Sequence, residues 1–566
     1  MYTRCLLPAT ALILSQGALA AGPSAEQDIR RFAEVDAGGA RVVTEYQDAA
    51  SGRTIQLSDD TGCMPEVVTS PNWVEADGGL AWICRDIAVG DNGAMVLAGK
   101  GLNNESLTMY NATSATPVWD FDALDSEDPI VSMAQRANRA AGMVIYDMDP
   151  GPDYDFEATV HVFSNTGDGT PEWSYTFPRT LNYFGGGTAV SDDGDVVLMW
   201  KADPNSQYLL VEAFRGDGTP ISSGQVQTVY NGNVYFHARQ TVLSDDGRRA
   251  YFNVGVEAVI YDVQTASVIY SHSINASFDS HALSGDGKTF AFGYFGYFEA
   301  WRETTPGNWN RVARQTQAGS TYVARLDLND DGSRLGYQIQ QYSPAYDHIE
   351  IGMYDVDNDV DMFHSSYDAP GTAYQLACAG VRVDQNGDSV AGISWGDSSH
   401  ATPEGFVYDA AGNVTCEISA RGSAFGIGFD ADGDVLAMGT KAVHANEFGN
   451  GGDVMVADAY DKTLRIVGYP VRGGTINLEV PAVGQQVRIV VCSGLGVSNT
   501  PYGPTEVDLG TELRRLGPYA IPGQGLVLPI DIPNSNSLAG RALHFQALIT
   551  GPGGELTNKV SIRVQP

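Results

Sequence analysis

Apolar strands that alternate with acidic turns recur along most of this chain. In each recurrence an apolar run leads into a tight turn that closes on Gly, and a second apolar run follows, as in AVSDDGDVVLMW around Gly194 and TVLSDDGRRAYFNV around Gly247. Asp-Gly and Asn-Gly pairs are typical of tight hairpins because these residues tolerate the positive φ angles that such turns need. The pattern therefore predicts a long series of β-hairpins.

The hairpins repeat at intervals that suit one structural unit. A strand that ends in an aromatic residue follows each hairpin, usually with a fourth apolar run after it. Four short strands repeated every 40 to 56 residues are typical of β-propeller blades. We predict an all-β propeller of eight blades, or of seven if the degenerate second unit is not a blade. The turns lie at Gly93, Asn138, Gly194, Gly247, Gly287, Gly332, Gly387 and Gly433.

One stretch of the repeats resembles known propeller families. Residues 245–270, DDGRRAYFNVGVEAVIYDVQTASVIY, are similar to the S-x-D-G-x-x-x-A-F…V-x-D pattern of TolB-like, WD40-like and YVTN-type repeats. The resemblance covers roughly residues 78–470 and implies the fold rather than a function. The chain departs from the pattern where Asp245 or Gly285 replaces the Pro of SPDG, and it lacks the Trp-Asp and Gly-His signatures of strict WD40 repeats.

The segments outside the repeats differ in texture. Residues 1–20 are typical of an export signal, with Arg4 before a short apolar core and the small residues Ala18 and Ala20 at the cleavage site. Residues 21–77 are polar, and their hairpin at 41–57 is a candidate to pair with the terminal blade and close the ring. The propeller is expected over 78–470. Residues 471–566 alternate with period 2 and predict a β-sandwich-like domain.

Charge and composition narrow the possible partners. The chain has 69 acidic and 33 basic residues, and removal of Arg4 with the signal changes the net charge from −36 to −37. So negative a surface repels nucleic acid and anionic lipid. No stretch approaches the roughly 20 apolar residues of a membrane-spanning helix. We expect a secreted, periplasmic or cell-surface protein with no transmembrane segment.

The mature chain holds an odd number of cysteines, so at least one is unpaired or pairs between chains. Cys63 and Cys84 are candidates for a disulfide in an oxidising compartment. Cys378 and Cys416 are a weaker pair, because they are expected on the inner and outer strands of one blade. The fifth is Cys492.

Two acidic patterns raise the question of calcium. Asp327, Asn329 and Asp331 match the first half of an EF-hand loop, but Gln338 replaces its bidentate Glu, and hairpin geometry alone explains the turn. Two loops gather further carboxylates that could fold around Ca²⁺, although so acidic a chain shows such runs by chance. They are Asp147, Asp149, Asp153 and Asp155 in one loop, and Asp355, Asp357, Asp359 and Asp361 in the other. No other cofactor is predicted.

Catalytic motifs are missing from the sequence: there is no Gly-x-Ser-x-Gly elbow, no His-Glu-x-x-His and no phosphate-binding loop. His237, Arg239 and His281 lie just before hairpin turns, on expected inner strands, and Arg85 has the same offset as Arg239. These four could meet at the channel mouth as a base and an oxyanion stabiliser. Alternatively, they are ordinary channel residues solvated by water.

Seven aromatic residues share one position in the repeat, 8 to 13 residues before a turn. This position is the start of an innermost strand or the loop before it, so their rings are expected on one face of the ring of blades. There they could stack on sugars or anchor a protein interface; alternatively, they pack between blades. The loop with Tyr294, Phe295, Tyr297 and Phe298 is a second candidate. The seven are Trp82, Tyr183, Phe236, Phe278, Tyr322, Tyr374 and Phe425.

These observations favour a binding module over an enzyme. The leading hypothesis is an exported propeller that recognises a polysaccharide or a protein through loops on one face. The first alternative is a propeller hydrolase or lyase, of the lactonase or glycan-degrading type, that acts at the channel mouth. The second is a cell-surface scaffold attached through its C-terminal domain. The fold does not decide among these hypotheses, because propellers host both binding and catalysis.

Overall fold

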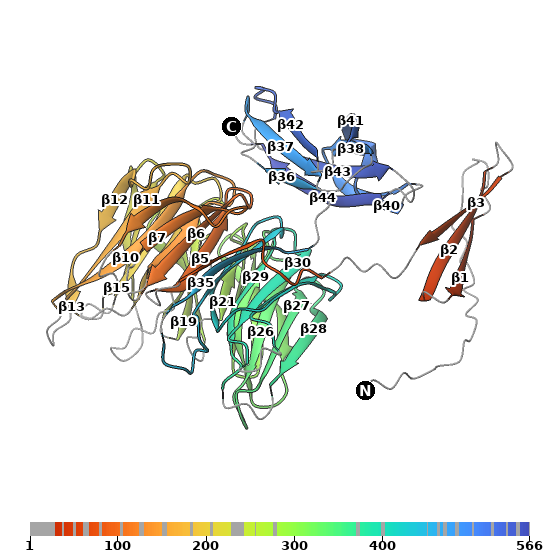
Figure 1. The fold of residues 1–566 in the computed structure, drawn as a ribbon. Coiled ribbons are helices and arrows are strands. Elements are labelled where there is room, and N and C mark those ends of the chain that lie inside the picture. Colours follow the sequence, from red (N-terminus) through yellow and green to blue (C-terminus); the bar gives the residue numbers. More distant parts are fainter. Residues whose placement is uncertain are drawn as a thin grey trace. The chain divides into compact units, whose positions relative to one another are not determined.

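The computed structural model of the chain divides into two compact units, Met1–Pro65 and Glu66–Pro566. In the first unit, β1 (Ile29–Asp36), β2 (Gly39–Asp48) and β3 (Arg53–Asp59) form an antiparallel sheet (Figure 1). The structure describes residues 29–36, 39–48, 53–59, 67–77, 82–101, 106–123, 129–149, 155–181, 185–203, 208–227, 243–254, 256–274, 280–369, 374–397, 402–449, 451–460, 464–467, 472–480, 486–500, 503–521, 526–538, 541–550 and 555–564.

The described part of the second unit begins with eight successive antiparallel sheets. The strands of each sheet are named in order, from the one nearest the centre of the ring outward. The first four are β5 (Ile83–Gly90), β6 (Met95–Gly101), β7 (Ser106–Asn111), β8 (Pro117–Asp122); β9 (Ile130–Met133), β10 (Ala140–Asp149), β11 (Asp155–Phe163), β12 (Trp173–Thr176), with β13 (Thr180–Leu181) beside β11; β14 (Gly186–Val190), β15 (Val196–Asp203), β16 (Tyr208–Arg215), β17 (Pro220–Gln227); and β18 (Arg249–Val254), β19 (Glu257–Asp262), β20 (Ser267–Ser273).

The next four sheets continue the same order. They are β21 (His281–Leu283), β22 (Thr289–Tyr294), β23 (Tyr297–Thr305), β24 (Asn308–Thr316); β25 (Thr321–Leu328), β26 (Arg334–Gln341), β27 (His348–Asp355), β28 (Val360–Asp368); β29 (Cys378–Val383), β30 (Ser389–Ser394), β31 (Gly405–Asp409), β32 (Val414–Ile418); and β33 (Ala424–Phe429), β34 (Val435–Thr440), β35 (Asp453–Asp458), with β4 (Trp73–Ala76) outermost. The inner strand of the last sheet packs against that of the first, so the sheets close into a ring. The chain is a β-propeller.

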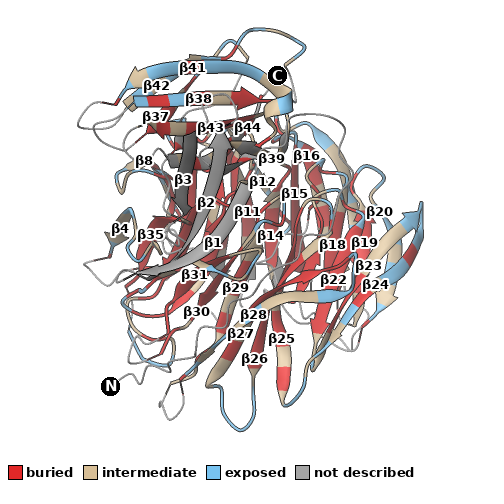
Figure 2. Ribbon diagram, turned by 90° about the vertical axis from the view of Figure 1, so that its right-hand side faces the viewer, coloured by how far each residue is buried: buried red, intermediate tan, exposed pale blue. Residues whose placement is uncertain are grey.

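Burial follows the position of each strand in its sheet. Every residue of β6 and β34 is buried, because the sheets pack face to face around the ring and cover both sides of a middle strand. The outer strands β4 and β28 alternate between covered and exposed side chains, because one of their faces meets water. In Figure 2, β18 and β19 are largely buried, whereas the outer strand of the same sheet, β20, is largely exposed. The hydrophobic core is therefore divided into layers between neighbouring sheets.

The Asp-Gly turns form the tight hairpins that the sequence predicts, with φ of 68° at Gly247. In this turn the Ser244 hydroxyl donates to the Asp246 carboxylate at 2.8 Å and accepts from the backbone N–H of Arg249 at 3.0 Å. Asp246 in turn accepts from the N–H of Arg248 at 3.0 Å. The recurring Ser and Asp therefore satisfy backbone groups within the turn itself, which is a structural reason for their repetition.

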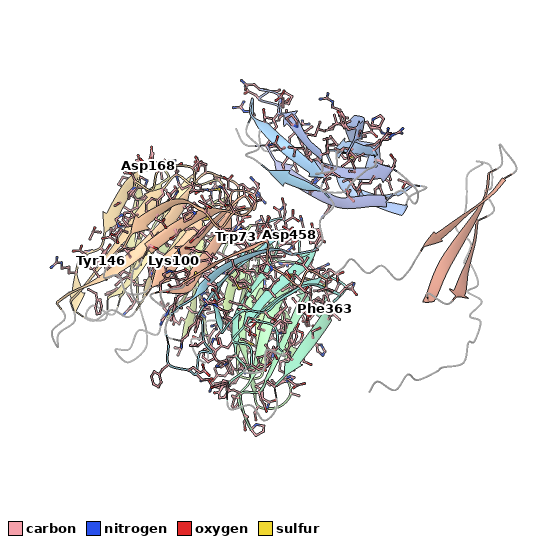
Figure 3. The ribbon with its side chains drawn as sticks, in the orientation of Figure 1. Trp73, Lys100, Tyr146, Asp168, Phe363 and Asp458 are labelled. Atoms are coloured by element: carbon pink, nitrogen blue, oxygen red, sulfur yellow. The ribbon has the colours of Figure 1, made fainter. Side chains whose placement is uncertain are left out.

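The ring is closed by a strand from the N-terminal side of the propeller. β4 pairs antiparallel with β35, and Asn72 donates to Asp458 at 3.0 Å; Trp73, Lys100 and Asp458 mark this region in Figure 3. Just before β4, Val68 forms a parallel bridge with Cys416 on β32. The closing strand is thus 73–76 rather than the predicted hairpin at 41–57, whose two strands pair with each other as β2 and β3. The last sheet is completed in this way because β35 has a free outer edge with which β4 pairs.

The C-terminal residues form two further sheets with a shared core. β36 (Arg465–Val467) pairs with β37 (Thr475–Val480), so residues 465–467, which lie within the range 78–470 expected for the propeller, belong instead to this region. Ile476, Val487 and Phe545 contribute to one buried cluster that both sheets cover. The sheets are β36, β37 and β42 (Leu526–Asp531), and β41 (Glu512–Ala520), β38 (Gln486–Cys492), β43 (Ala542–Thr550) and β44 (Glu555–Arg563); β39 (Leu495–Thr500) pairs with β40 (Gly503–Val507).

The cysteines in the described residues are buried free thiols, at Cys84, Cys378, Cys416 and Cys492. Cys378 and Cys416 lie on the inner and outer strands of one sheet, as expected. Three strand spacings separate them by about 14 Å, beyond the Cα distance of about 7 Å that a disulfide can bridge. The predicted weaker pair is therefore wrong. Cys63 lies outside the described residues.

Among the described residues, no helix has the length and apolar character needed to cross a membrane.

Candidate functional site

The turns of neighbouring sheets hydrogen-bond to one another around the centre of the ring. Asp192 donates its backbone N–H to the carbonyl of Asp245 at 3.0 Å, and Asp245 donates to Gly285 at 2.8 Å. Asp330 and Gln385 continue this chain of backbone bonds. Ala431 of the last sheet donates to the Gln135 side chain at 3.2 Å, which completes the circle. The second residue of each turn therefore lies at one end of the central channel.

Arg136 from the degenerate second unit neutralises the carboxylates of this circle. Its guanidinium lies 3.1 Å from Asp192 and 3.4 Å from Asp330, and it also donates to Gln385. Burial and the two neighbouring carboxylates raise the pKa of Asp245, whereas Arg136 lowers it. The turn end of the channel is therefore held together by an internal ion network.

Side chains also join neighbouring inner strands along the channel. Asp327 accepts from the N–H of Val383 in the next sheet at 2.9 Å, and Asp86 accepts from the N–H of Val131 at 2.8 Å. Burial raises the pKa of Asp327 to about 6, although Arg382 and the backbone N–H groups lower it. A cavity of about 200 Å³ lies among these strands. Asp327 thus links two sheets, whereas Asn329 and Asp331 of the predicted EF-hand-like pattern bond within their own turn.

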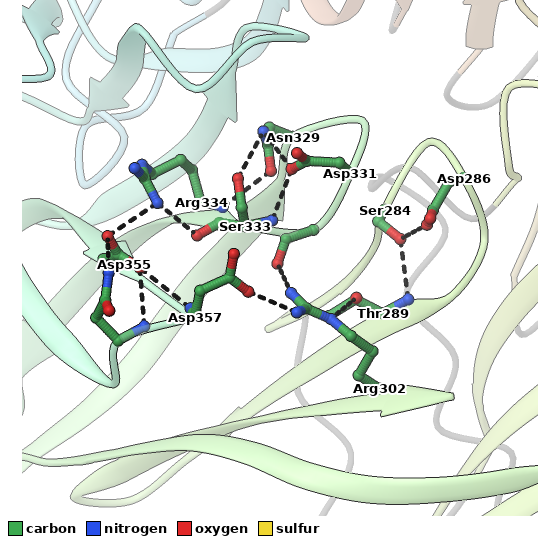
Figure 4. A network of polar contacts seen from close by, with 12 residues as sticks. Ser284, Asp286, Thr289, Arg302, Asn329, Asp331, Ser333, Arg334, Asp355 and Asp357 are labelled. Carbon is green, nitrogen blue, oxygen red and sulfur yellow. Dashed lines mark hydrogen bonds and ion pairs between the residues drawn. The ribbon is translucent and has the colours of Figure 1, made fainter. Parts of the chain in front are cut away.

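The remaining residues of that turn, Asn329 and Asp331, hydrogen-bond to each other at 3.0 Å, and each also accepts a backbone N–H of the turn. Figure 4 shows these bonds beside the second predicted acidic cluster. Among the described residues, no group of three or more His, Cys, Asp and Glu side chains is arranged to hold a metal ion. The EF-hand-like pattern is a hairpin signal.

The carboxylates of the predicted calcium loop have separate partners. Asp355 accepts from two backbone N–H groups of its own loop and pairs with Arg334 at 3.0 Å. Asp357 pairs with Arg302 at 2.5 Å. Asp359 and Asp361 accept the hydroxyls of Tyr354 and Tyr337, at 2.8 and 2.7 Å. The four groups therefore do not converge on one point. The side chains of the other predicted loop, 147–155, lie outside the described residues.

The structure does not assemble the predicted catalytic set within the described residues. His281 is 1% exposed and packs edge-on against Tyr251, with ring centres 5.2 Å apart, so it belongs to the core beneath the channel wall. Arg85 is partly exposed at the start of the first inner strand. Burial lowers the pKa of Lys441, and the charge of Arg85 lowers it further by a smaller amount. His237 and Arg239 lie outside the described residues.

Aromatic side chains gather at the opposite end of the channel, where the inner strands begin. Phe295, in the β22–β23 hairpin, forms an isolated bridge with Tyr322 at the start of β25. Its ring centre lies 5.3 Å from that of Tyr342 and 5.3 Å from that of Tyr294. Phe295 is 43% exposed and Tyr342 is 37% exposed. Two separately predicted features, Tyr322 and the 294–298 loop, therefore form one exposed cluster, although Phe298 is buried in the core.

This cluster continues onto the next two sheets. The carbonyl of Tyr346 accepts from the N–H of Leu376 at 2.8 Å, which ties the β26–β27 loop to the loop before β29. In that loop Tyr374 stacks on His444 at 4.7 Å and donates its hydroxyl to Glu447. We call this series the aromatic arc; it comprises Tyr294, Phe295, Tyr322, Tyr342, Tyr346, Tyr374, Trp395, Phe425, His444 and Phe448.

The other predicted aromatic residues have different surroundings. Phe425 lies beside Trp395, with ring centres 6.1 Å apart. Trp82 is only 8% exposed, and the Lys100 ammonium lies 4.5 Å from its ring centre, so it packs within the first sheet. Tyr183, Phe236 and Phe278 lie outside the described residues. Packing is thus the role of Trp82, whereas Tyr322, Tyr374 and Phe425 join the arc.

Sequence reasoning missed half of the arc. Tyr342, Tyr346, Trp395 and Phe448 lie in the loops that follow the second strand of a sheet, which end on the same face as the starts of the inner strands. The signal was present in the sequence, because QQYSPAY and ISWGD place aromatic residues directly after the second apolar run. An antiparallel hairpin returns to the level at which it began, so both positions meet on one face.

Comparisons with known proteins show no family for this chain. No protein-family model and no curated protein matches the chain. A solved Dos1 propeller is similar over 69% of this chain and 95% of its own, with 12% identity and a TM-score of 0.47. Chaetomium thermophilum Sqt1, solved bound to the N-terminus of the ribosomal protein L10, is similar over 68% and 98%, with 12% identity and a TM-score of 0.46. At these values the likeness carries no argument about function.

Proposed function

We propose that this chain is a binding propeller that recognises a protein partner through the aromatic arc. The observation that carries this proposal is the exposure of rings on neighbouring loops of one face, with Phe295 at 43%, Tyr346 at 38% and Phe448 fully exposed. Aromatic side chains dominate the binding energy of protein interfaces because they bury large apolar areas at little entropic cost. Exposed apolar groups that are contiguous rather than scattered mark such interfaces.

Two observations support binding over catalysis. The described histidine of the predicted catalytic set lies in the core, and Arg136 pairs with the carboxylates of Asp192 and Asp330 at the turn end of the channel. We also propose that the protein is exported, because residues 1–20 have the pattern of an export signal. The hydrolase or lyase and the cell-surface scaffold stay predictions. The scaffold is tested by truncating the chain before residue 464 and locating the shortened protein in the cell; an unchanged location would contradict attachment through the C-terminal domain.

The experiment is an affinity capture from the source organism, with a glycan array run on the same proteins. The full chain is compared with a Phe295→Ala/Phe448→Ala variant. Val268→Ala/Ile269→Ala is the matched control, because these side chains are 46% and 36% exposed on the outer strand β20. Capture of a protein that only the arc variant loses supports the proposal. Glycan binding that only the arc variant loses would replace the protein partner with a polysaccharide, and equal capture by all three chains would refute the arc as the binding face.

A further inference from the structure

We infer that the occupant of the aromatic arc is an extended, basic segment of a partner protein. This inference rests on the proposed function and adds the chemistry of the partner. It follows from three properties of the arc: its length across several sheets, the angles between its rings, and the charges along its edge.

The arc extends over the loops of four successive sheets. Its contacts pass from the β22–β23 hairpin through Tyr322 and Tyr342 to the β26–β27 loop, then through Leu376 and Tyr374 to the loop after β34. Four sheets therefore contribute to one continuous line. A compact ligand reaches only part of such a line, whereas a peptide of about 12 extended residues covers roughly 40 Å.

The rings around Phe295 meet edge to face, which suits side chains better than sugars. The Phe295 ring is inclined by 64° to Tyr322, by 78° to Tyr342 and by 80° to Tyr294. A sugar stacks on a flat, open ring face, but this arrangement presents edges and the notches between them. Aliphatic side chains fill such notches, and so do the methylene stems of Arg and Lys, whose charged ends can stay in water.

The carboxylates of the arc outnumber its available cations. Asp347 follows Tyr346, and Glu447 precedes Phe448; Asp368 has a side chain that is 65% exposed. Two cations lie near one end of the arc: Lys441, which donates to the carbonyls of Glu447 and His444, and Arg85, whose charge acts on Lys441. A third, Arg421, is paired with Asp453 by a two-point contact. The chain as a whole carries a net charge of −36. Basic segments are thus attracted at long range and meet the carboxylates of Asp347, Glu447 and Asp368 at the arc, to which Gln341, Tyr374 and His348 donate.

His348 does not reverse this local charge. Its Nδ1 lies 2.7 Å from Asp368 and its Nε2 lies 3.1 Å from Glu350, so even a protonated His348 is outnumbered by the two carboxylates that hold it. Gln341, which donates to Asp347 at 3.2 Å, is neutral. The edge of the arc between β26 and β28 therefore stays negative whatever the protonation state of the imidazole.

The test uses two pools of synthetic peptides of about 12 residues and the full-length chain. Both pools share the same Leu, Phe and Pro positions; one carries Lys and Arg at the others, and the second carries Asp and Glu. Fluorescence polarisation measures Kd. We expect the basic pool to bind at least about tenfold more tightly than the acidic pool and to weaken as the salt rises from about 0.05 to about 0.5 M, because salt screens exposed charges.

Two variants separate this inference from the proposed function. Asp347→Asn/Glu447→Gln keeps both hydrogen-bond acceptors and should remove most of the preference for basic peptides. Asp120→Asn/Asp122→Asn on the outer strand β8 is the matched control with equal loss of charge and should leave that preference unchanged. Phe295→Ala/Phe448→Ala should abolish binding of the basic pool.

Equal binding of both pools, still lost in the Phe295/Phe448 variant, would overturn the basic partner and leave the binding face in place. Binding of the basic pool that survives the aromatic substitutions would overturn the arc as its site. Binding of neither pool would also overturn the inference, and the affinity capture would then decide the proposed function independently.

Discussion

Glu75 and Lys100 form an ion pair that joins the last sheet of the ring to the first. Glu75 lies on β4 and Lys100 on β6, and the ammonium lies 3.0 Å from the carboxylate. Lys100 is 4% exposed, and Tyr110 on β7 also donates its hydroxyl to Glu75. Side chains therefore reinforce the strand pairing that closes the propeller.

The Glu75→Gln variant should be less stable because it leaves the Lys100 ammonium covered without its carboxylate. We expect a loss of about 2 kcal/mol in the free energy of unfolding, less than for a fully buried pair because water reaches Glu75. Urea unfolding of the wild type, Glu75→Gln, Lys100→Met and the double variant measures the coupling. A cost of Glu75→Gln below about 0.5 kcal/mol would mean that solvent already screens the pair.

The Arg136→Gln variant should be destabilised more strongly as the pH rises. Burial, Asp192 and Asp330 raise the pKa of Asp245, and Arg136 lowers it. Without the guanidinium the folded-state pKa rises further above the unfolded value. A group with a raised folded pKa contributes stability below its unfolded pKa and loses it as the pH rises through the folded pKa. Thermal unfolding from about pH 4 to about pH 9 covers this window.

Arg139→Gln is the control for this experiment. Arg139 comes from the same segment, but it donates to the carbonyl of Gly194 at 2.7 Å and contacts Glu172 only at 3.5 Å. Its loss should lower the unfolding temperature by a similar amount at every pH. Parallel pH profiles for the two variants would contradict the role of Arg136 as the counter-ion of the channel.

His348 should stabilise the loop end of its sheet at low pH. Burial lowers the pKa of His348, but the bonds to Asp368 and Glu350 outweigh it, so the net shift is upward from 6.5. Because the folded pKa is raised, this contribution is complete below the unfolded pKa and is lost as the pH rises through the folded value. NMR titration of the imidazole should give a pKa above 6.5 in the wild type, and a lower one in Asp368→Asn. An unchanged pKa in that variant would contradict the assignment.

Substitution of Gly307 and Gly332 by Ala should distinguish the cost of backbone strain at positive φ from the cost of steric crowding by a neighbouring side chain. Gly332 has φ of 70° and an added Cβ would lie 2.4 Å from the Thr289 hydroxyl, whereas Gly307 has φ of 78° and open space around it. We expect Gly307→Ala to cost about 1 kcal/mol from backbone strain alone. Gly332→Ala should cost about 1 to 3 kcal/mol more, because the Cβ also displaces a packed neighbour. Equal losses in urea unfolding would show that Thr289 yields freely.

The sequence predicted the fold from its turns, because the hydrogen bonds of Ser244 and Asp246 are local and leave a local pattern. The partner of β35 could not be predicted in this way. β4 has only four residues, and its pairing with a strand almost four hundred residues away depends on which sheet edge is left free once the ring has formed. The pattern of a strand shows that it pairs, but not with which strand.

The site was predictable only in part for a similar reason. Tyr322 lies 10 residues before the turn at Gly332 and Tyr374 lies 13 residues before the turn at Gly387, and this position in the repeat predicts the face on which the structure has them. Their neighbours Tyr342 and His444 come from other loops, and the contacts at 6.4 and 4.7 Å depend on how adjacent sheets pack. The calcium hypothesis for the acidic loop at 355–361 rested on closeness in the sequence. Asp355 and Asp357 are close in the sequence, but they pair with arginines on different strands and so do not share one ligand.

The position of β4 has a consequence for the kinetics of folding. Asn72 and Asp458 are hydrogen-bonded at 3.0 Å although 386 residues separate them, whereas the other propeller sheets pair strands that follow one another in the sequence. Closing so long a loop has a large entropic cost, and proteins rich in such contacts fold slowly. Until β4 arrives, the wholly buried β35 is an unpaired edge on which another chain can add a strand. We therefore expect aggregation during refolding to start at this edge, and a chaperone that covers it to raise the yield.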